Sequence, residues 1–387
     1  MSEGGRKMLL LEMKRRLCTR YVLFSLLGVL IITIGLNLII VSHQNGIVHS
    51  LQEEAVYEGD IKEENLFLAL RKVRDEKSGD RRYSSQVFII GGLVNNYPGV
   101  LYTERKVEDY PDKYANEFYQ CWRNKFEFLI KRNLPIKEQQ TALTKLHEVK
   151  TPFARYPGYY LYYTALDNIQ VIFIIILFLV TFFASGIYSD SFEDESMEII
   201  RTTKLYKTNM WIRILPVIFY GVLLTLIATL VTVGMISSVV GLKVLKSSFK
   251  MIALFTFGNL SIGQAIAIMM LAEIIGIFSL STSMGYFSFK TKKTTTAIGI
   301  GVSLSIFYMI GSKFVSLPAI KYLFNAIPMV SSQVLLSISS FSINFGIWEP
   351  YVIMLENFII FILSTVALAI NFLPQYTLIY FVYLAYS

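Results

Sequence analysis

Residues 169–185 read IQVIFIIILFLVTFFAS, residues 188–210 read YSDSFEDESMEIIRTTKLYKTNM, and a second apolar run follows from Trp211 to Ser237. An apolar run of about 20 residues is long enough to cross the hydrocarbon core of a bilayer as a helix. The stretch from Leu166 to Leu226 therefore predicts two transmembrane helices joined by a charged segment at one membrane face, and the rest of the chain is organised around it.

The charged segment has an ordered distribution of charge. Its acids come first and its bases last: Asp190, Glu193, Asp194, Glu195 and Glu198, then Arg201, Lys204 and Lys207. A helix dipole favours this order. Asp190 and Glu193, three positions apart, predict a capping box at the start of that helix. Phe192, Ile199, Ile200 and Leu205 supply apolar side chains with which the segment could dock on another surface.

The composition indicates a membrane protein. Hydrophobic residues make up 54% of the chain and the mean hydropathy is +0.51, well above the values of soluble domains. The net charge of +8 is expected to reflect membrane topology and not nucleic-acid binding. The two cysteines, Cys18 and Cys121, are predicted on opposite sides of the membrane, which excludes a disulfide within the chain.

The N-terminal part predicts an uncleaved first span. Residues 1–20 carry six bases and precede an apolar run over residues 21–42. This run is longer than the apolar core of a signal peptide and lacks a small-residue cleavage site. Basic flanks favour the cytoplasm, so we expect a cytoplasmic N-terminus. Asn37 lies within the span, either as an amide facing a neighbouring helix or as a substrate contact.

Residues 43–166 have dense, balanced charge and predict a mainly helical extracytoplasmic domain. One apolar face recurs at helical spacing through Phe118, Trp122, Phe126, Leu129 and Ile130. Periodicity leaves residues 86–93 open between a strand and a buried helix turn. An aromatic-rich segment over residues 153–163 suits a membrane-interface belt before the second span.

Residues 167–387 predict transmembrane helices 2 to 6, the last three over residues 261–287, 296–312 and 351–373. Three lysines in the outer connection over residues 239–258 weigh mildly against this orientation, whereas those of the turn after the fourth span agree with it. Glu273 lies near the middle of the fourth span and Glu356 near the outer end of the sixth. An ionisable residue at such a depth either packs in a neutral or satisfied state or lines a translocation path.

The charged segment resembles the cytoplasmic coupling region of ABC-2 type permeases, the membrane subunits of ATP-driven exporters. The likeness rests on Glu193 and Glu195, the run Arg201-Thr202-Thr203-Lys204, then Lys207 and Arg213. Ser196-Met197 stands where a glycine often follows the acid. The layout over the whole chain, with its large domain after the first span, is similar to that of Gram-positive members.

The resemblance also bears on residues 314–348. Permeases of this family join the fifth and sixth spans by short half-inserted helices on the outer side, and Pro318 and Pro328 are similar breaks. The alternative is an extra span over residues 317–336. The uncharged tail, residues 374–387, departs from the basic ending usual in the family.

The resemblance implies a permease subunit in the cell membrane that pairs with a separate ATP-binding cassette subunit and with a second permease copy. ATP would bind the partner, and this chain would hold no cofactor. The coupling segment, residues 189–210, would contact the ATPase through Phe192, Glu193, Glu195, Ile199, Ile200, Arg201 and Lys204. Glu273, Asn37 and Glu356 are candidates for the translocation path. Family members of this shape commonly export peptides or give resistance to antimicrobial compounds.

The sequence contains no motif for chemistry of its own. It has no G-x-x-x-x-G-K-[ST], no H-E-x-x-H and no G-x-S-x-G, and its three histidines lack metal-ligand spacing. We therefore expect no enzyme in this chain. A second hypothesis is a membrane sensor or scaffold whose extracytoplasmic domain binds a peptide or a cell-wall ligand.

Overall fold

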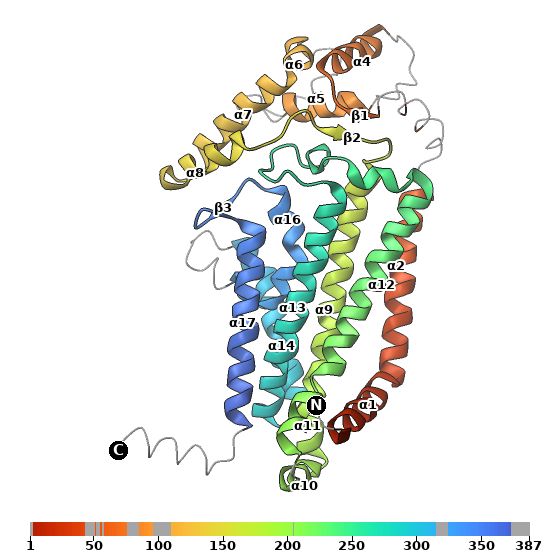
Figure 1. Cartoon of the computed structure of the whole chain (residues 1–387), viewed down its shortest axis with the longest axis vertical. Helices are drawn as coiled ribbons and strands as arrows, with labels where there is room; N and C mark the ends of the chain where they lie inside the picture. The colour runs from red at the N-terminus through yellow and green to blue at the C-terminus, as the bar shows by residue number, and fades with distance from the viewer. Residues whose placement is uncertain are drawn as a thin grey trace.

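The computed structural model describes residues 3–42, 51, 55, 58–75, 85–95, 110–203, 205–314 and 324–372. In these ranges it is a bundle of long helices with a smaller helical domain at one end (Figure 1). The only sheets described are two two-stranded pairs, β1–β2 and β3–β4. The prediction of an all-α membrane protein is confirmed at this level.

Five described helical stretches are long and apolar enough to cross a membrane. They are α2 (Arg20–Ser42), α9 (Leu161–Glu193), α11 with α12 (Tyr206–Ile212 and Leu215–Val240), α13 (Ile262–Thr291) and α17 (Glu349–Asn371). The predicted fifth span corresponds to α14 (Thr294–Phe314), whose described apolar part is shorter. The count of six spans therefore stays a prediction.

Local chemistry fixes where several long helices begin and end. Pro216 and Pro350 occupy first-turn positions of α12 and α17, where the missing N–H costs nothing. Ser261 and Gln264 form a capping box at the start of α13. Gly241, at φ 81°, terminates α12 in a conformation that favours glycine.

Helices α9 and α13 form the centre of the bundle, and α12, α14 and α17 pack around them. Small residues allow close approach. A Cβ on Gly221 of α12 would lie 2.8 Å from Cγ2 of Ile277 and 2.9 Å from Cγ2 of Val180, and a Cβ on Gly301 would lie 2.5 Å from Cγ2 of Thr181. Tight packing of this kind drives helix association where the surrounding lipid is as apolar as the side chains.

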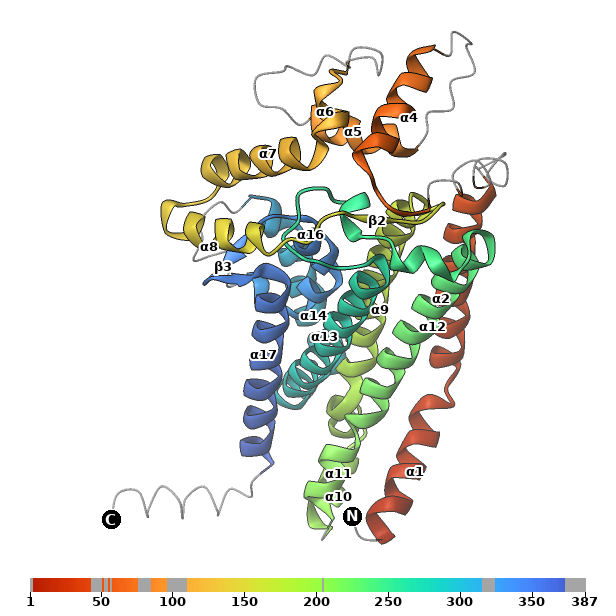
Figure 2. The ribbon, with the colours of Figure 1, turned by 45° about the horizontal axis from the view of Figure 1, so that its top comes forward.

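The two ends of the bundle differ. Helix α1 (Glu3–Leu17), α10 (Ser196–Thr202) and α11 lie together at the end that carries the N-terminus, which we call the basic end (Figures 1 and 2). The helical domain caps the opposite end, which we call the domain end.

The helical domain contains β1 (Gly59–Asp60), α4 (Glu63–Asp75), α5 (Ser85–Asn95), α6 (Lys113–Asn116), α7 (Phe118–Asn133), α8 (Ile136–His147) and β2 (Ala154–Arg155). The expected apolar face of α7 is confirmed at Phe118, Trp122, Phe126 and Ile130, which are all fully buried, whereas Leu129 is half-buried. Helix α5 resolves the alternative over residues 86–93 in favour of a helix.

Aromatic contacts join this domain to the bundle through the connection after α12. The Trp122 indole donates to the Leu254 carbonyl at 2.9 Å, and Phe126 stacks on Phe257 with centroids 4.9 Å apart. Two of the three lysines in this connection have partners within the chain. Lys243 pairs with Glu58 at 3.1 Å, and the buried Lys250 donates to carbonyls. Contacts within the chain therefore account for these two charges, and they weigh less against the predicted orientation.

The segment between α14 and α17 is built from short elements in its described part. These are η4 (Pro328–Gln333), α16 (Val334–Ser339), β3 (Ile343–Asn344) and β4 (Ile347–Trp348). A six-residue helix is far too short to cross a bilayer. The described part of residues 317–336 thus does not form the extra span that was the alternative. Pro318 and residues 374–387 lie outside the described residues.

Candidate functional site

The predicted capping box of Asp190 and Glu193 is wrong, because α9 continues without a break through both residues. Their carboxylates instead reach the start of α14. Glu193 Oε1 accepts from the Thr294 backbone N–H at 2.8 Å, and Asp190 Oδ1 accepts from the Thr294 hydroxyl at 3.0 Å. Acids are favourable at a helix N-terminus, so both residues secure α14 against α9.

The charged segment leaves α9 at Asp194, the first residue after the end of that helix, and forms the connection to α12 through α10 and α11. Asp194 Oδ1 accepts from the Ser196 backbone N–H at 3.0 Å, and hydrogen bonds from Ser196 lower the pKa of the Asp194 carboxyl. Between them Glu195 adopts a left-handed conformation, with φ 59°. Sequence reasoning missed this turn, because left-handed residues are usually glycine or asparagine. Glu195 therefore works as a turn residue with an exposed carboxylate.

The predicted docking residues divide into inward and outward groups. Phe192 lies edge-on to Phe289, and the cations of Arg201 and Lys292 approach its ring at 5.4 and 5.5 Å. Ile200 is half-buried against the core. Ile199 and Leu205 are 71% and 41% exposed, so Ile199 is the most exposed apolar side chain of this group. Lys204 lies outside the described residues.

Two arginines, one from α1 and one from the end of α11, meet at one carbonyl of α9. Arg16 of α1 donates to the Ile187 carbonyl at 2.9 Å, and Arg213 donates to the same oxygen at 3.4 Å and to Ser191 Oγ at 2.6 Å. Both arginines are buried. In the sequence, Arg16 was one of six bases that indicated a cytoplasmic N-terminus, and Arg213 was part of the resemblance to the permeases. Their shared acceptor could not be predicted, because tertiary packing brings both residues to the same carbonyl of α9.

The three candidates for a translocation path lie on three different helices. Asn37 of α2 is buried and donates to the Thr33 carbonyl at 2.8 Å and to Thr232 Oγ1 of α12 at 3.0 Å. It thereby bridges two helices. Glu356 is half-buried on α17. These contacts do not bring Asn37 and the two glutamates into one site.

Glu273 has the most unusual surroundings of the three. Its side chain is fully buried in α13, and its Oε1 has no hydrogen-bond partner. Ser331 of η4 lies 3.4 Å from Oε2 but donates to the Pro328 carbonyl at 2.7 Å. A buried carboxylate without a cation is costly, so the geometry suits a neutral carboxylic acid.

Neither a family model, nor a curated protein, nor a solved structure matches this chain.

Proposed function

We propose that this chain is the permease subunit of an ATP-driven ABC exporter, working with a separate ATP-binding subunit and a second permease copy. The observation that carries the proposal is the connection formed by α10 and α11. It extends beyond the bundle at the basic end and presents the exposed Ile199. An exposed apolar side chain on a short helix suits docking into a groove of another subunit.

The mechanics of the connection support the same proposal. It joins α9 and α12, and Arg213, between α11 and α12, ties the far side of the connection back to the Ile187 carbonyl of α9. A displacement of α10 by a partner would therefore pull on two long helices at once. Peptides or antimicrobial compounds are the proposed substrates, and Glu273 is the leading candidate for a polar group along their path.

The test is co-purification of the full chain with the ATP-binding subunit encoded beside it, followed by ATP hydrolysis assays with and without added peptides. Ile199→Asp should abolish complex formation or stimulated hydrolysis, because it places a charge where an apolar contact is expected. Ile136→Asp is the matched control, since Ile136 is 86% exposed at the domain end. Ile200→Asp is less informative, because Ile200 also packs against the core.

A chain that binds no ATP-binding subunit, or a complex that Ile199→Asp leaves intact and active, would overturn the coupling assignment. The first result would favour the sensor hypothesis, in which the helical domain binds a ligand. A neighbouring gene for a kinase or regulator in place of an ATPase would point the same way.

A further inference from the structure

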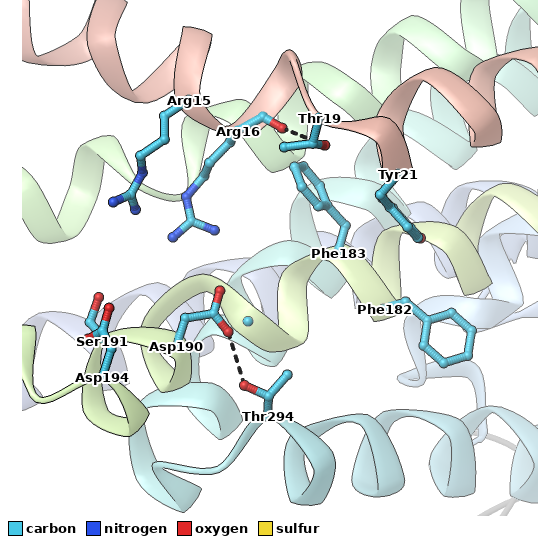
Figure 3. A pocket seen from close by; sticks show the side chains of 11 residues that line it. Arg15, Arg16, Thr19, Tyr21, Phe182, Phe183, Asp190, Ser191, Asp194 and Thr294 are labelled. Atoms are coloured by element: carbon cyan, nitrogen blue, oxygen red, sulfur yellow. Dashed lines mark hydrogen bonds between the residues drawn. The ribbon is translucent and has the colours of Figure 1, made fainter.

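A cavity of about 480 Å³ lies at the basic end, between α1 and the last turns of α9. Arg15 and Arg16 line one wall, and Asp190 and Asp194 line the other (Figure 3). Thr294 of α14 also lines it. The proposed function does not use this cavity.

The two walls carry opposite charge without touching. Arg15 and Arg16 both pair with Glu12 on their own helix, at 3.2 and 2.6 Å, which leaves a net positive wall. Among the described residues, neither arginine forms an ion pair with Asp190 or Asp194. The carboxylates accept hydrogen bonds from Thr294 and Ser196 and form a negative wall. A cavity with separated charges matches a ligand that carries both an anion and a cation.

Aromatic residues form the inner end of the same cavity. Tyr21 stacks on Phe183 with centroids 5.9 Å apart, and its hydroxyl donates to the Leu179 carbonyl at 2.9 Å. Tyr21 and Phe182 are 38% and 42% exposed. They lie where the apolar parts of α2 and α9 end, which is the depth of lipid headgroups. The cavity therefore faces charge on one side and acyl chains on the other.

Gly186 keeps the negative wall in place. A Cβ at this position would lie 2.7 Å from Oδ1 and 2.8 Å from Oδ2 of Asp190, so any larger residue would displace that carboxylate. Because Gly186 has no side chain, the Asp190 carboxylate can lie against the preceding turn of α9.

We propose that this cavity binds the headgroup of a zwitterionic phospholipid with a primary ammonium group, of the phosphoethanolamine type. The phosphate lies beside Arg15 and Arg16, and the ammonium donates to Asp190 and Asp194. A primary ammonium supplies N–H donors that a quaternary choline lacks, so hydrogen bonds to carboxylates distinguish the two. Binding of this lipid requires that the helices lie in a membrane but requires no ATPase partner. A negative result for one proposal therefore does not decide the other.

The test is native mass spectrometry of the full chain purified in detergent and incubated with equimolar ethanolamine, choline and glycerol phospholipids of identical acyl chains. We expect the wild type to retain the ethanolamine lipid about 5-fold over the choline lipid, the effect of one charge-assisted hydrogen bond. Asp190→Asn with Asp194→Asn should bring the two to parity. Arg15→Gln should weaken retention of the ethanolamine lipid.

Lys14→Gln and Glu198→Gln are the matched controls, because both residues are exposed at the same end and do not line the cavity. Arg15→Gln keeps the test usable if the aspartate variants misfold, since the Arg15 side chain is 61% exposed. Equal retention of all three lipids by the wild type would overturn the proposal, as would selectivity that the asparagine variants leave unchanged. Soluble phosphoethanolamine that binds the chain but leaves lipid retention unchanged would overturn a lipid as the occupant.

Discussion

Gly276 is the residue that lets η4 lie against α13 beside the buried Glu273. A Cβ there would lie 2.0 Å from Ser331 Oγ and 3.2 Å from the Pro328 carbonyl oxygen. Gly276→Ala should therefore lower the free energy of unfolding by about 1–3 kcal/mol, the usual cost of overpacking. Thermal unfolding of the purified protein in detergent measures the change as a lower Tm.

The control for this variant is Gly28→Ala, because nothing lies within 4 Å of a Cβ at Gly28 in α2. Adding Ser331→Gly to Gly276→Ala should recover part of the lost stability by removing the clashing hydroxymethyl group. A Gly276→Ala protein as stable as Gly28→Ala would show that η4 does not pack this closely.

Lys250 provides a second prediction at the scale of one residue. Its side chain is buried at the domain end and donates to the carbonyls of Thr256 and Gly258. Burial lowers the pKa of Lys250 from 10.5 to about 7. Between these values the unfolded chain binds more protons than the folded one, so this lysine makes stability rise with pH, by about 1 kcal/mol per pH unit.

Measurement of Tm at pH 6 and pH 9 tests this contribution. Lys250→Met removes it and should flatten the rise relative to the wild type, even though the variant also loses two hydrogen bonds at every pH. Lys246→Met, at an exposed lysine in the same connection, should leave the pH dependence unchanged. Parallel pH profiles for the wild type and Lys250→Met would refute the shifted titration.

At the scale of an element, the turn between α9 and α10 depends on a non-glycine residue in a left-handed conformation. Glu195 has φ 59° and ψ 1°. Glu195→Gly should stabilise the fold by roughly 1 kcal/mol, seen as a Tm higher by roughly 1–3 °C, because glycine adopts this conformation without strain. Glu198→Gly, inside α10, should act in the opposite direction, because glycine weakens a helix. A lower Tm for Glu195→Gly would mean that its side chain stabilises the turn.

The elements that the sequence predicted best are those whose signal is local. Long apolar runs predicted α2, α12, α13 and α17 to within a few residues, since the bilayer sets their length, whereas α9 extends well beyond its apolar run at both ends. The face of α7 followed from its periodicity. The end of α9 was placed too early, because its last turns are polar and are helical through contacts with α14. The shared acceptor of Arg16 and Arg213 and the contact of Ser331 with Gly276 join residues far apart in sequence, and no periodicity encodes such pairs.

At the scale of the whole molecule, the distribution of charge supports the proposed orientation. The basic end gathers the bases of α1 with Lys207 and Arg213, whereas two of the lysines at the domain end are paired or buried. Positive charge favours the cytoplasmic face. The proposed orientation therefore places the helical domain outside the cell, and the two native cysteines, exposed Cys18 and half-buried Cys121, on opposite sides.

Labelling of single cysteines in intact cells tests this orientation. In a protein lacking Cys18 and Cys121, Ile136→Cys should react with a membrane-impermeant maleimide from outside, because Ile136 is 86% exposed on α8 of the helical domain. Lys207→Cys, exposed at the basic end, should react only after the cells are permeabilised. Cys121 is less suitable as a probe, since burial raises the pKa of its thiol and slows its reaction. The reverse labelling pattern would place the helical domain in the cytoplasm. It would remove the basis for docking an ATPase on α10, because ATP would then lie on the other side of the membrane.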